Sequence, residues 1–392
     1  MVFLCKVEGM HGSDRKRIAI LADYPYWQYI QGCDRQGRHP TPWLAALVQA
    51  FSRTPGVESP FDKYEFHWIV LTKAVKKERT EEVNGQFMHL IPSGSKTVSQ
   101  YLRYWPDRLK IRKFLKRLKP DLVHAWGTES AYGLCAKDFK GKKLFSLQGA
   151  LTAYAQRAYM APFMVRQARF EKEVFSAMPI ITAESSWARD CVLELVPTAD
   201  VRLWEYAAEE RFFGMERRMA EHPLCVMAGT DSPIKNLRLA ISAFSRPELK
   251  HVTLYLAGAR PESYPNLPEN IKPLGFVSRD RMVELHRASW ALVHPSLADC
   301  CPNVVKEART MGVPCVVTSE CGAKQYIEHG KSGYIIEPHD EQQLVDAVLS
   351  MTKDAQTSID MGQHDRERCR EALSQKTMID GILALYSEIL QD

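Results

Sequence analysis

The sequence predicts an α/β protein of two domains, each built on a mostly parallel sheet. A chain of 392 residues is longer than one hydrophobic core usually supports. Short apolar runs typical of buried strands recur along it, separated by amphipathic stretches typical of helices. The stretch 290–317 gives a strand, a loop, a helix and a strand in succession. Within one sheet layer this order is a right-handed parallel crossover.

Composition and charge narrow the class of protein. Hydrophobic residues make up 45% and charged residues 25% of the chain, as in an ordinary globular protein, and the net charge of +5 is modest, so we expect no nucleic-acid partner. The ten cysteines include no CxxC pair and one adjacent couple, Cys300 and Cys301, which is typical of reduced thiols in a cytosolic protein. The apolar run at 2–4 is too short for a signal peptide, and no run approaches the ~20 residues of a spanning helix. We therefore expect a cytoplasmic protein, soluble or peripheral on the inner face of the membrane.

The first predicted strand, 17–22 (RIAILA), leads into a long loop at 23–39. This loop carries aromatic and basic side chains, among them Tyr24 and Arg38. Aromatic rings can stack on a sugar face or pack the loop onto its own domain, and the residues leave both roles open. The loop ends at 41–42, where a threonine can cap a helix that has proline in its first turn.

Two further strands are predicted at 66–72 and 87–91, with charged linker sequence between them. The segment 101–119 is predicted as one basic amphipathic helix, because its apolar residues recur at intervals compatible with one helical face. Such a helix fits an anionic membrane surface. A solvated face over a stripe packed on the core fits the same pattern, and both interpretations stay open. The apolar residues are Leu102, Trp105, Leu109, Phe114, Leu115 and Leu118; the basic ones are Arg103, Arg108, Lys110, Arg112, Lys113, Lys116, Arg117 and Lys119.

The rest of the first domain alternates strands and helices. A turn and a strand are predicted over 120–127, and His124 within them is a candidate cleft residue, although a histidine near a strand end is more often structural. A strand at 143–147 leads to Gln148, whose amide can form hydrogen bonds but cannot change charge near neutral pH. A last strand and helix occupy 180–195.

The second domain is predicted to begin with a strand at 223–228, followed by the loop 229–236. The loop carries Lys235, and a lone loop lysine is by itself usually solvated. Further strands are predicted at 251–257 and 272–277, and an amphipathic helix at 377–390.

The stretch 290–317 concentrates the candidate chemistry. Its first strand stops at His294, a candidate cleft residue, because the proline that follows has no amide hydrogen for a ladder. Asp299 and Glu307 bracket the loop and the helix after it. At a rise of about 1.5 Å per residue they would touch different parts of one elongated ligand, and the amides at the helix start suit anionic groups. We predict a phosphate-bearing, hydroxyl-rich ligand; the alternative is a capping Asp and a solvated Glu.

Residues 298–338 (ADCCPNVVKEARTMGVPCVVTSECGAKQYIEHGKSGYIIEP) resemble the carboxy-terminal signature of the retaining glycosyltransferases of family 4, or glycosyl transferases group 1, which have the GT-B fold. That signature has a loop glutamate followed eight residues later by a second glutamate. Here Asp299 stands at the first position and Glu307 at the second. The residues that match the pattern are Pro302, Asn303, Val304, Val305, Glu307, Ala308, Gly312, Pro314, Gly330, Gly333 and Pro338.

The resemblance implies two Rossmann-like domains that face each other across a cleft. The expected acceptor domain is 1–207, completed by a helix in 375–392 that crosses back to it, and the expected donor domain is 208–374. The implied reaction is retaining transfer of a hexosyl group from a nucleotide diphosphate sugar to a hydroxyl group. The implied acceptor is a glycan or a lipid-linked glycan in cell-surface polysaccharide biosynthesis. No cofactor and no metal are implied, because lysine and helix amides stabilise the developing charge.

The resemblance also assigns roles to residues. Asp299, Glu307 and Lys235 are the implied catalytic group, with Lys235 at the donor diphosphate, Asp299 at the donor sugar and Glu307 at the ribose hydroxyls. Thr230 stands where the family has an arginine, and Gln148 where many members have a histidine. The implied donor-binding residues are Gly229, Thr230, Lys235, Asn236, Phe276, Val277, Cys300, Cys301, Pro302, Asn303 and Glu307; the acceptor or cleft residues are Tyr24, Arg38, His124, Gln148 and His294.

Two rival functions fit the same fold. An NDP-sugar epimerase would need acid and base groups around the sugar and no separate acceptor. A catalytically silent nucleotide-sugar-binding protein would keep the scaffold after the changes at Thr230, Gln148 and Asp299. The register of Asp299 and Glu307 favours transfer over epimerisation.

Overall fold

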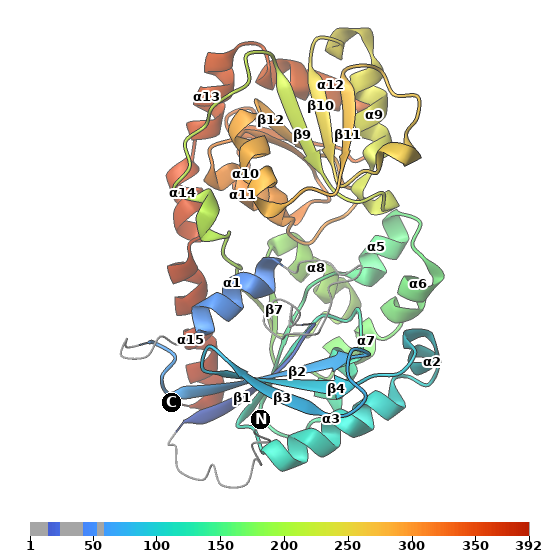
Figure 1. Cartoon of the computed structure of the whole chain (residues 1–392), viewed down its shortest axis with the longest axis vertical. Helices are drawn as coiled ribbons and strands as arrows, with labels where there is room; N and C mark the ends of the chain where they lie inside the picture. The colour runs from blue at the N-terminus through green and yellow to red at the C-terminus, as the bar shows by residue number, and fades with distance from the viewer. Residues whose placement is uncertain (1–14, 24–41, 53–58, 392) are drawn as a thin grey trace, which may run out of the picture.

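A computed structural model of the chain describes residues 15–23, 42–52 and 59–391. Two α/β domains lie one above the other, each with its own sheet and hydrophobic core (Figure 1). Two mostly parallel sheets with covering helices confirm the predicted fold class. The predicted acceptor-loop residues Tyr24 and Arg38 lie outside the described residues. The predicted domain boundary at 207/208 stays a prediction.

The first domain contains an eight-stranded sheet in the order β3-β4-β2-β1-β5-β6-β7-β8. All neighbouring strands are parallel except β3 and β4. The strands are β1 Lys16–Leu21, β2 Tyr64–Thr72, β3 Arg79–Val83, β4 Gln86–Pro92, β5 Leu122–Trp126, β6 Lys143–Ser146, β7 Ile181–Ala183 and β8 Val201–Leu203; the helices are α1 Pro42–Phe51, α2 Lys96–Tyr101, α3 Trp105–Leu118, α4 Tyr132–Asp138, α5 Leu151–Arg157, α6 Pro162–Ala168, α7 Glu171–Phe175 and α8 Ser186–Leu195.

The charged linker expected between β2 and β4 is wrong in part, because it contains the edge strand β3. Its residues RTEEV are mostly solvent-facing, so they lack the apolar alternation that marks a strand. The feature of the sequence that indicates this hairpin is its turn. Asn84 and Gly85 have φ values of 51° and 74°, and an Asn-Gly pair in the left-handed region is the preferred two-residue hairpin turn.

The single helix expected over 101–119 is two helices, α2 and α3. The break falls at Arg103 and Tyr104, both in the left-handed region with φ values of 50° and 55°. It divides the predicted apolar stripe. Phe114 and Leu115 are buried as expected, whereas Leu102, Trp105 and Leu109 are exposed.

The second domain contains a six-stranded parallel sheet in the order β11-β10-β9-β12-β13-β14. Strands β12 and β13 are adjacent and parallel with α11 between them, as the crossover reading predicted. The strands are β9 Leu224–Ala228, β10 Thr253–Ala257, β11 Ile271–Gly275, β12 Ala291–His294, β13 Cys315–Thr318 and β14 Gly333–Ile336; the helices are α9 Leu237–Ser245, α10 Arg279–Ala288, α11 Asn303–Thr310, α12 Glu341–Met351, α13 Ala355–Gln363 and α14 Arg366–Ala372.

Helix α15 (Gln375–Leu390) leaves the second domain and packs on the first, as expected (Figure 1). Met378 and Tyr386 share a hydrophobic core with strands β1, β2 and β5. The Trp204 indole N–H donates to the Met378 carbonyl oxygen at 2.9 Å. A Cβ at Gly381 would lie 2.8 Å from Trp204 Cδ1, so the close approach of the helix requires glycine there.

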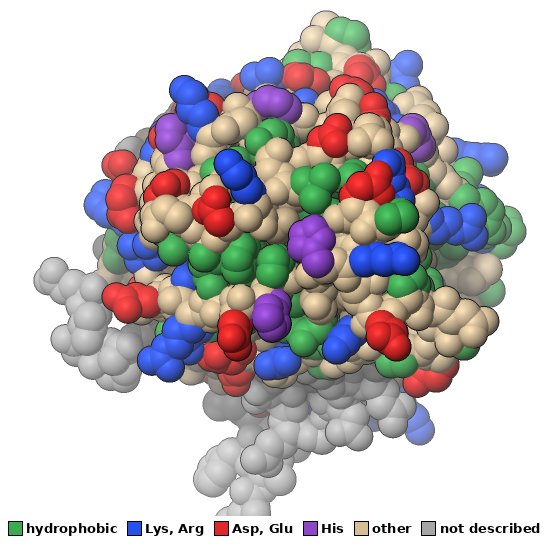
Figure 2. Space-filling view, turned by 90° about the horizontal axis from the view of Figure 1, so that it is seen from above, with side chains coloured by type: hydrophobic (Ala, Val, Ile, Leu, Met, Phe, Trp, Pro, Cys, Tyr) green, Lys and Arg blue, Asp and Glu red, His purple; other side chains and the backbone are tan. Residues whose placement is uncertain are grey.

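Two further observations bear on the surface and the thiols. Among the described helices, none combines the length and the apolar character that crossing a bilayer requires. The eight cysteines in the described part of the chain are buried and carry no disulfide. Figure 2 views the molecule from above, and on this face acidic, basic and apolar side chains are interspersed.

Candidate active site

The loops after β9 and β12 meet because these two parallel strands are neighbours in the second sheet. Lys235 from the first loop places its Nζ 2.5 Å from Oδ2 of Asp299 in the second. His294, at the end of β12, places its Nε2 3.1 Å from the same oxygen. Ligands bind to open parallel sheets at the carboxyl ends of the strands. The structure therefore brings Lys235, Asp299 and His294 together at that edge.

Asp299 is ionised in this cluster. Burial alone would raise the pKa of its carboxyl, but the Lys235 ammonium and the His294 imidazole outweigh burial and hold that pKa well below its usual range. Burial lowers the pKa of His294, although Asp299 opposes this shift. Its Nδ1 is buried and has no hydrogen-bond partner among the described residues. The charged Asp299 carboxylate thus contacts the partly exposed Lys235 ammonium and the buried His294 imidazole.

Asn236 was expected to contact the donor, and its side chain already forms two hydrogen bonds to backbone carbonyl groups. Its Nδ2 donates to the carbonyl oxygens of Pro295 at 3.0 Å and Pro338 at 2.9 Å. These bonds fix the lysine loop against the loop after β12. Asn236 also sits in the left-handed region with φ 54°, where asparagine is better tolerated than most residues. The Asn236 side chain thus helps to hold the loop of Lys235 in place.

Glu307 lies in the second turn of α11 and is 2% exposed. Its Oε1 is 2.5 Å from Arg279 Nη2, and its Oε2 is 3.7 Å from His286 Nε2. Burial would raise the pKa of Glu307, but His286 and Arg279 together lower it, so the carboxyl is charged. Arg279 also pairs with Glu209 at 2.6 Å. Glu307 is therefore not the solvated glutamate of the alternative reading.

The other predicted donor residues surround this group. Thr230 and Phe276 are exposed beyond the ends of β9 and β11, with Val277 partly buried beside the latter. Cys300 and Cys301 are buried, and Pro302 directly precedes α11, which begins at Asn303. Gly229 lies under Gly258, since a Cβ at Gly258 would come within 2.3 Å of the Gly229 carbonyl oxygen.

The first domain contacts the second beside Asp299. The Cys300 amide donates to the Tyr154 hydroxyl oxygen at 3.1 Å, and the Ser185 hydroxyl donates to the Cys300 carbonyl oxygen at 2.6 Å. The amide of Cys300, an expected donor-binding residue, is therefore already engaged in a hydrogen bond. Arg157 at the end of α5 pairs with Glu320 at 2.7 Å. These contacts hold the loop of Asp299 against the first domain.

Glu129 follows β5 and is a polar residue that was not among the predicted site residues. Its carboxylate lies against two glycines: a Cβ at Gly127 would be 2.2 Å from Oε2, and one at Gly149 would be 2.6 Å from Oε1. The Gln148 Oε1 atom is 3.3 Å from that same Gly127 position. The carboxylate and the Gln148 amide thus share a small space at the carboxyl ends of β5 and β6.

The same space adjoins the loop of Asp299. The Tyr154 ring lies 3.4 Å from the Gly149 Cβ position that Glu129 also approaches, and the Tyr154 hydroxyl reaches Cys300. Burial and the neighbouring carboxylates of Glu171 and Asp23 raise the pKa of Glu129 to about 8. A carboxyl group that titrates near neutral pH can accept or donate a proton there. The feature of the sequence that could have indicated Glu129 is its position just after a predicted strand.

His124 was expected near the cleft, and this prediction is wrong. The ring is fully buried, with Nδ1 2.9 Å from the Tyr386 hydroxyl of α15 and Nε2 2.7 Å from the Ser146 hydroxyl. It stacks on Trp126 with ring centroids 3.6 Å apart. Burial holds its pKa well below the usual range, so it is a neutral core residue. Its β5 position faces α15 and not the strand end.

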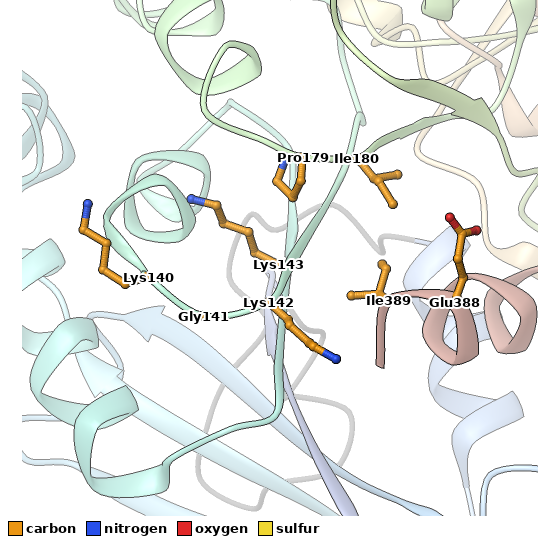
Figure 3. A pocket seen from close by; sticks show the side chains of 8 residues that line it. All are labelled: Lys140, Gly141, Lys142, Lys143, Pro179, Ile180, Glu388 and Ile389. Carbon is orange, nitrogen blue, oxygen red and sulfur yellow. The ribbon is translucent and has the colours of Figure 1, made fainter. Parts of the chain in front are cut away.

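Two other features stand apart from this group. A pocket between the start of β6, residues 179–180 and the end of α15 is lined by three lysines (Figure 3). There Lys142 donates to the Leu390 carbonyl oxygen at 2.9 Å, so this pocket belongs to the seam that attaches α15. Within the described residues, Glu328, His364 and Asp365 form a trio with spacing suited to a metal ion. This trio lies by α14, not beside Lys235.

Comparison with known proteins finds a similarity that falls on the second domain. Residues 210–368 match the family described as Glycosyl transferases group 1. The second domain is therefore similar to the glycosyltransferases of this group. Among curated relatives of the group 1 domain, the chain is 26% identical over 166 residues to N-acetyl-alpha-D-glucosaminyl L-malate synthase of Bacillus anthracis, covering 41% of this chain and 44% of that protein. It is 25% identical over 219 residues to D-inositol 3-phosphate glycosyltransferase of Corynebacterium efficiens, covering 51% of each.

The chain thus spans about half the length of these group 1 relatives. Solved structures extend the fold over both domains. Sucrose-phosphate synthase from Thermosynechococcus elongatus has a TM-score of 0.75 at 13% identity, over 96% of this chain and 100% of that one. Anabaena Alr3699/HepE, solved in complex with UDP-glucose, has a TM-score of 0.68 at 14% identity, over 95% and 99%. These likenesses show that the group 1 domain is one half of a two-domain GT-B fold.

Proposed function

We propose that the protein is a retaining, metal-independent glycosyltransferase that moves a sugar from a nucleotide diphosphate sugar to a hydroxyl group. The partly buried contact of Lys235 with Asp299, beside His294 at the carboxyl ends of β9 and β12, carries this proposal. Its place within a glycosyl transferases group 1 domain supports it. The proposed acceptor is a glycan or a lipid-linked glycan in cell-surface polysaccharide synthesis. The proposed site of action is the cytoplasm.

When the donor binds, its diphosphate is proposed to replace Asp299 as the partner of Lys235. A diphosphate would attract the Lys235 ammonium, which at present pairs with the carboxylate at 2.5 Å. Asp299 would then accept hydrogen bonds from the donor sugar, while the His294 imidazole stays beside it at 3.1 Å. A single cation and amides at the start of α11 can stabilise the developing negative charge without a metal. The HepE complex with UDP-glucose shows that a protein of this fold binds such a donor.

The nucleoside is proposed to lie between α11 and the end of β11. Glu307 would accept the ribose hydroxyls, which requires Arg279 to give up part of its 2.5 Å contact with the carboxylate. Arg279 keeps a second partner for this, because Glu209 lies 2.6 Å from the same nitrogen. The base would contact the exposed Phe276 and the partly buried Val277 beyond β11.

The acceptor is proposed to enter from the first domain, at Glu129 and Gln148. These two polar groups share the space at the ends of β5 and β6, next to the Tyr154 ring that touches the donor loop through Cys300. In same-face transfer the leaving phosphate oxygen takes the proton of the acceptor hydroxyl. Glu129 would orient that hydroxyl by a hydrogen bond and is not required to remove its proton.

A panel of nucleotide sugars tests the proposal, first without acceptor and then with oligosaccharide or lipid-linked acceptors. We expect acceptor-dependent nucleotide release, full activity after treatment with a chelator, and a product with the anomeric configuration of the donor by NMR. Isomerised donor without acceptor would establish an epimerase. Donor binding without turnover on any acceptor would establish a silent binding protein.

A further inference from the structure

An exposed apolar patch lies at the junction of α2 and α3. Of the eleven large hydrophobic side chains that are exposed within the described residues, five fall between 98 and 109. Scattered exposed apolar residues need no explanation, but a local cluster marks an interaction surface. The patch consists of Val98, Tyr101, Leu102, Trp105 and Leu109, which are 41% to 67% exposed.

The patch continues into a row of basic side chains along the same face of α3. Trp105, Leu109, Arg112 and Lys116 follow one another at helical spacings of four, three and four, so they project from one side of the helix. Lys113 borders this row. The opposite side holds the buried residues Asp107, Ile111, Phe114 and Leu115. Helix α3 therefore lies with its long axis along the surface and turns an outward face that is apolar at its start and basic toward its end.

The basic row keeps its charge available. Arg112, Lys113 and Lys116 are exposed, and within residues 15–23, 42–52 and 59–391 none of them forms an ion pair. By contrast, Arg108, one turn before Arg112, is paired with Asp138 at 2.6 Å. The acidic residue of this helix, Asp107, is 2% exposed and does not neutralise the row. On the face of the molecule that Figure 2 shows from above, by contrast, acidic side chains lie among the basic ones.

We propose that α2 and α3 dock the protein on the surface of an anionic lipid bilayer. A helix that lies flat, with Trp, Tyr and Leu beside an unpaired row of Lys and Arg, matches the interface of such a bilayer: rings and aliphatic groups enter the headgroup boundary and cations meet the phosphates. A second copy of the chain would bring the same positive row against itself, which disfavours that occupant. Docking by this surface does not depend on the proposed transfer reaction.

The docked face also lies next to the proposed acceptor entrance. Helix α6 packs beside α2, where Arg166 lies 4.9 Å over the Tyr101 ring. Helix α5 follows beside α6, and Arg157 at its end contacts Glu320 of the second domain at 2.7 Å. In Figure 1 these elements form one flank, from α3 at the outer end of the first domain to the second domain. An acceptor held at the bilayer would therefore meet the flank that leads to Asp299.

Vesicle co-sedimentation of the full chain tests this proposal. We expect binding to phosphatidylcholine vesicles that contain phosphatidylglycerol, weaker binding to phosphatidylcholine alone, and a strong loss between about 0.1 M and about 1 M salt as the Debye length falls from ~10 Å to ~3 Å. Removing three charges with R112Q/K113Q/K116Q should weaken binding to the anionic vesicles roughly a hundredfold, at about fivefold for each residue. The apolar variant W105S/L109S should weaken it on both vesicle types.

A matched control removes the same charge elsewhere. R218Q/K250Q/K353Q changes exposed cations of the second domain and should leave vesicle binding within about twofold of the parent, because these positions lie outside the docked face. Absence of binding to anionic vesicles would overturn the proposal. So would equal losses in the control and in R112Q/K113Q/K116Q, or a concentration-dependent dimer that W105S/L109S abolishes. Nucleotide release without vesicles is measured in parallel and reports on transfer alone.

Discussion

Removing the Lys235 ammonium should lower both stability and donor affinity, through two separable effects. In Lys235→Ala the Asp299 carboxylate keeps His294 at 3.1 Å but loses the cation at 2.5 Å. Breaking a buried ion pair costs about 3–5 kcal/mol. Lys235 is a quarter exposed, so we expect the low end, about 3 kcal/mol in the free energy of unfolding at pH 7. Losing a charged hydrogen bond to the donor diphosphate should weaken donor binding by about 1.5–3 kcal/mol, or roughly 10- to 150-fold.

The pH dependence follows from the sign of the Asp299 shift. Because its pKa is depressed in the folded protein, the stabilisation is present above the ordinary carboxyl pKa and is lost as pH falls through the folded value. The Lys235→Ala variant should therefore approach the parent in urea-determined stability only in strong acid. Donor binding is measured by calorimetry with UDP-, GDP- and ADP-sugars.

A double variant separates the structural effect from the binding effect. Lys235→Ala with Asp299→Asn leaves no unpaired buried charge, so most of the lost stability should return while donor affinity stays low. Lys235→Arg keeps the charge and should retain part of both. The reasoning is refuted if Lys235→Ala binds every donor as tightly as the parent, or if the double variant is as unstable as Lys235→Ala alone.

Three further changes test other parts of the molecule. Glu307→Ala should weaken donor binding about tenfold and leave Arg279 paired with Glu209, which nucleotide titration measures; unchanged affinity would remove Glu307 from the site. Glu129→Gln should flatten the fall in stability that the parent shows as pH rises from 4.5 to about 8, because its pKa is raised on folding; identical pH profiles of unfolding would contradict this. Gly381→Ala should destabilise the protein by about 1–3 kcal/mol in urea unfolding, since the new Cβ meets a ring atom at 2.8 Å; a neutral result would show that the helix can shift.

The second domain was the part most readily predicted from the sequence. Its central strands β9, β12 and β13 are continuous buried apolar runs, such as the CVVT of β13, and these runs stand out against their surroundings. The β3 edge strand was missed because its charged residues face solvent on one edge of the sheet. The break between α2 and α3 was missed although Pro106, at the second position of α3, is a proline typical of a helix start. The left-handed conformation of Arg103 and Tyr104 itself has no local signal in the sequence.

The sequence indicates which residues follow the ends of strands, but it does not indicate in which direction each of their side chains points. The resemblance assigned Lys235 and Asp299 to one site, and the structure brings them together because they follow the neighbouring strands β9 and β12. Whether a side chain near a strand end faces the cleft or the core depends on packing. His124 faces α15, which arrives from a distant part of the chain, while Glu129 turns back over Gly127 and Gly149. Neither orientation has a local pattern.

The return of α15 to the first domain sets an order of folding during synthesis. Met378, Ile382 and Tyr386 complete a core whose other members come from strands β1, β2 and β5. Residues 208–374, in contrast, are contiguous and bury their own sheet. The ribosome therefore releases the first domain with an apolar groove uncovered until the whole second domain has followed. The first domain is therefore synthesised first, but its core is completed last. Until α15 has docked, a chaperone or a second nascent chain can bind to the uncovered apolar groove.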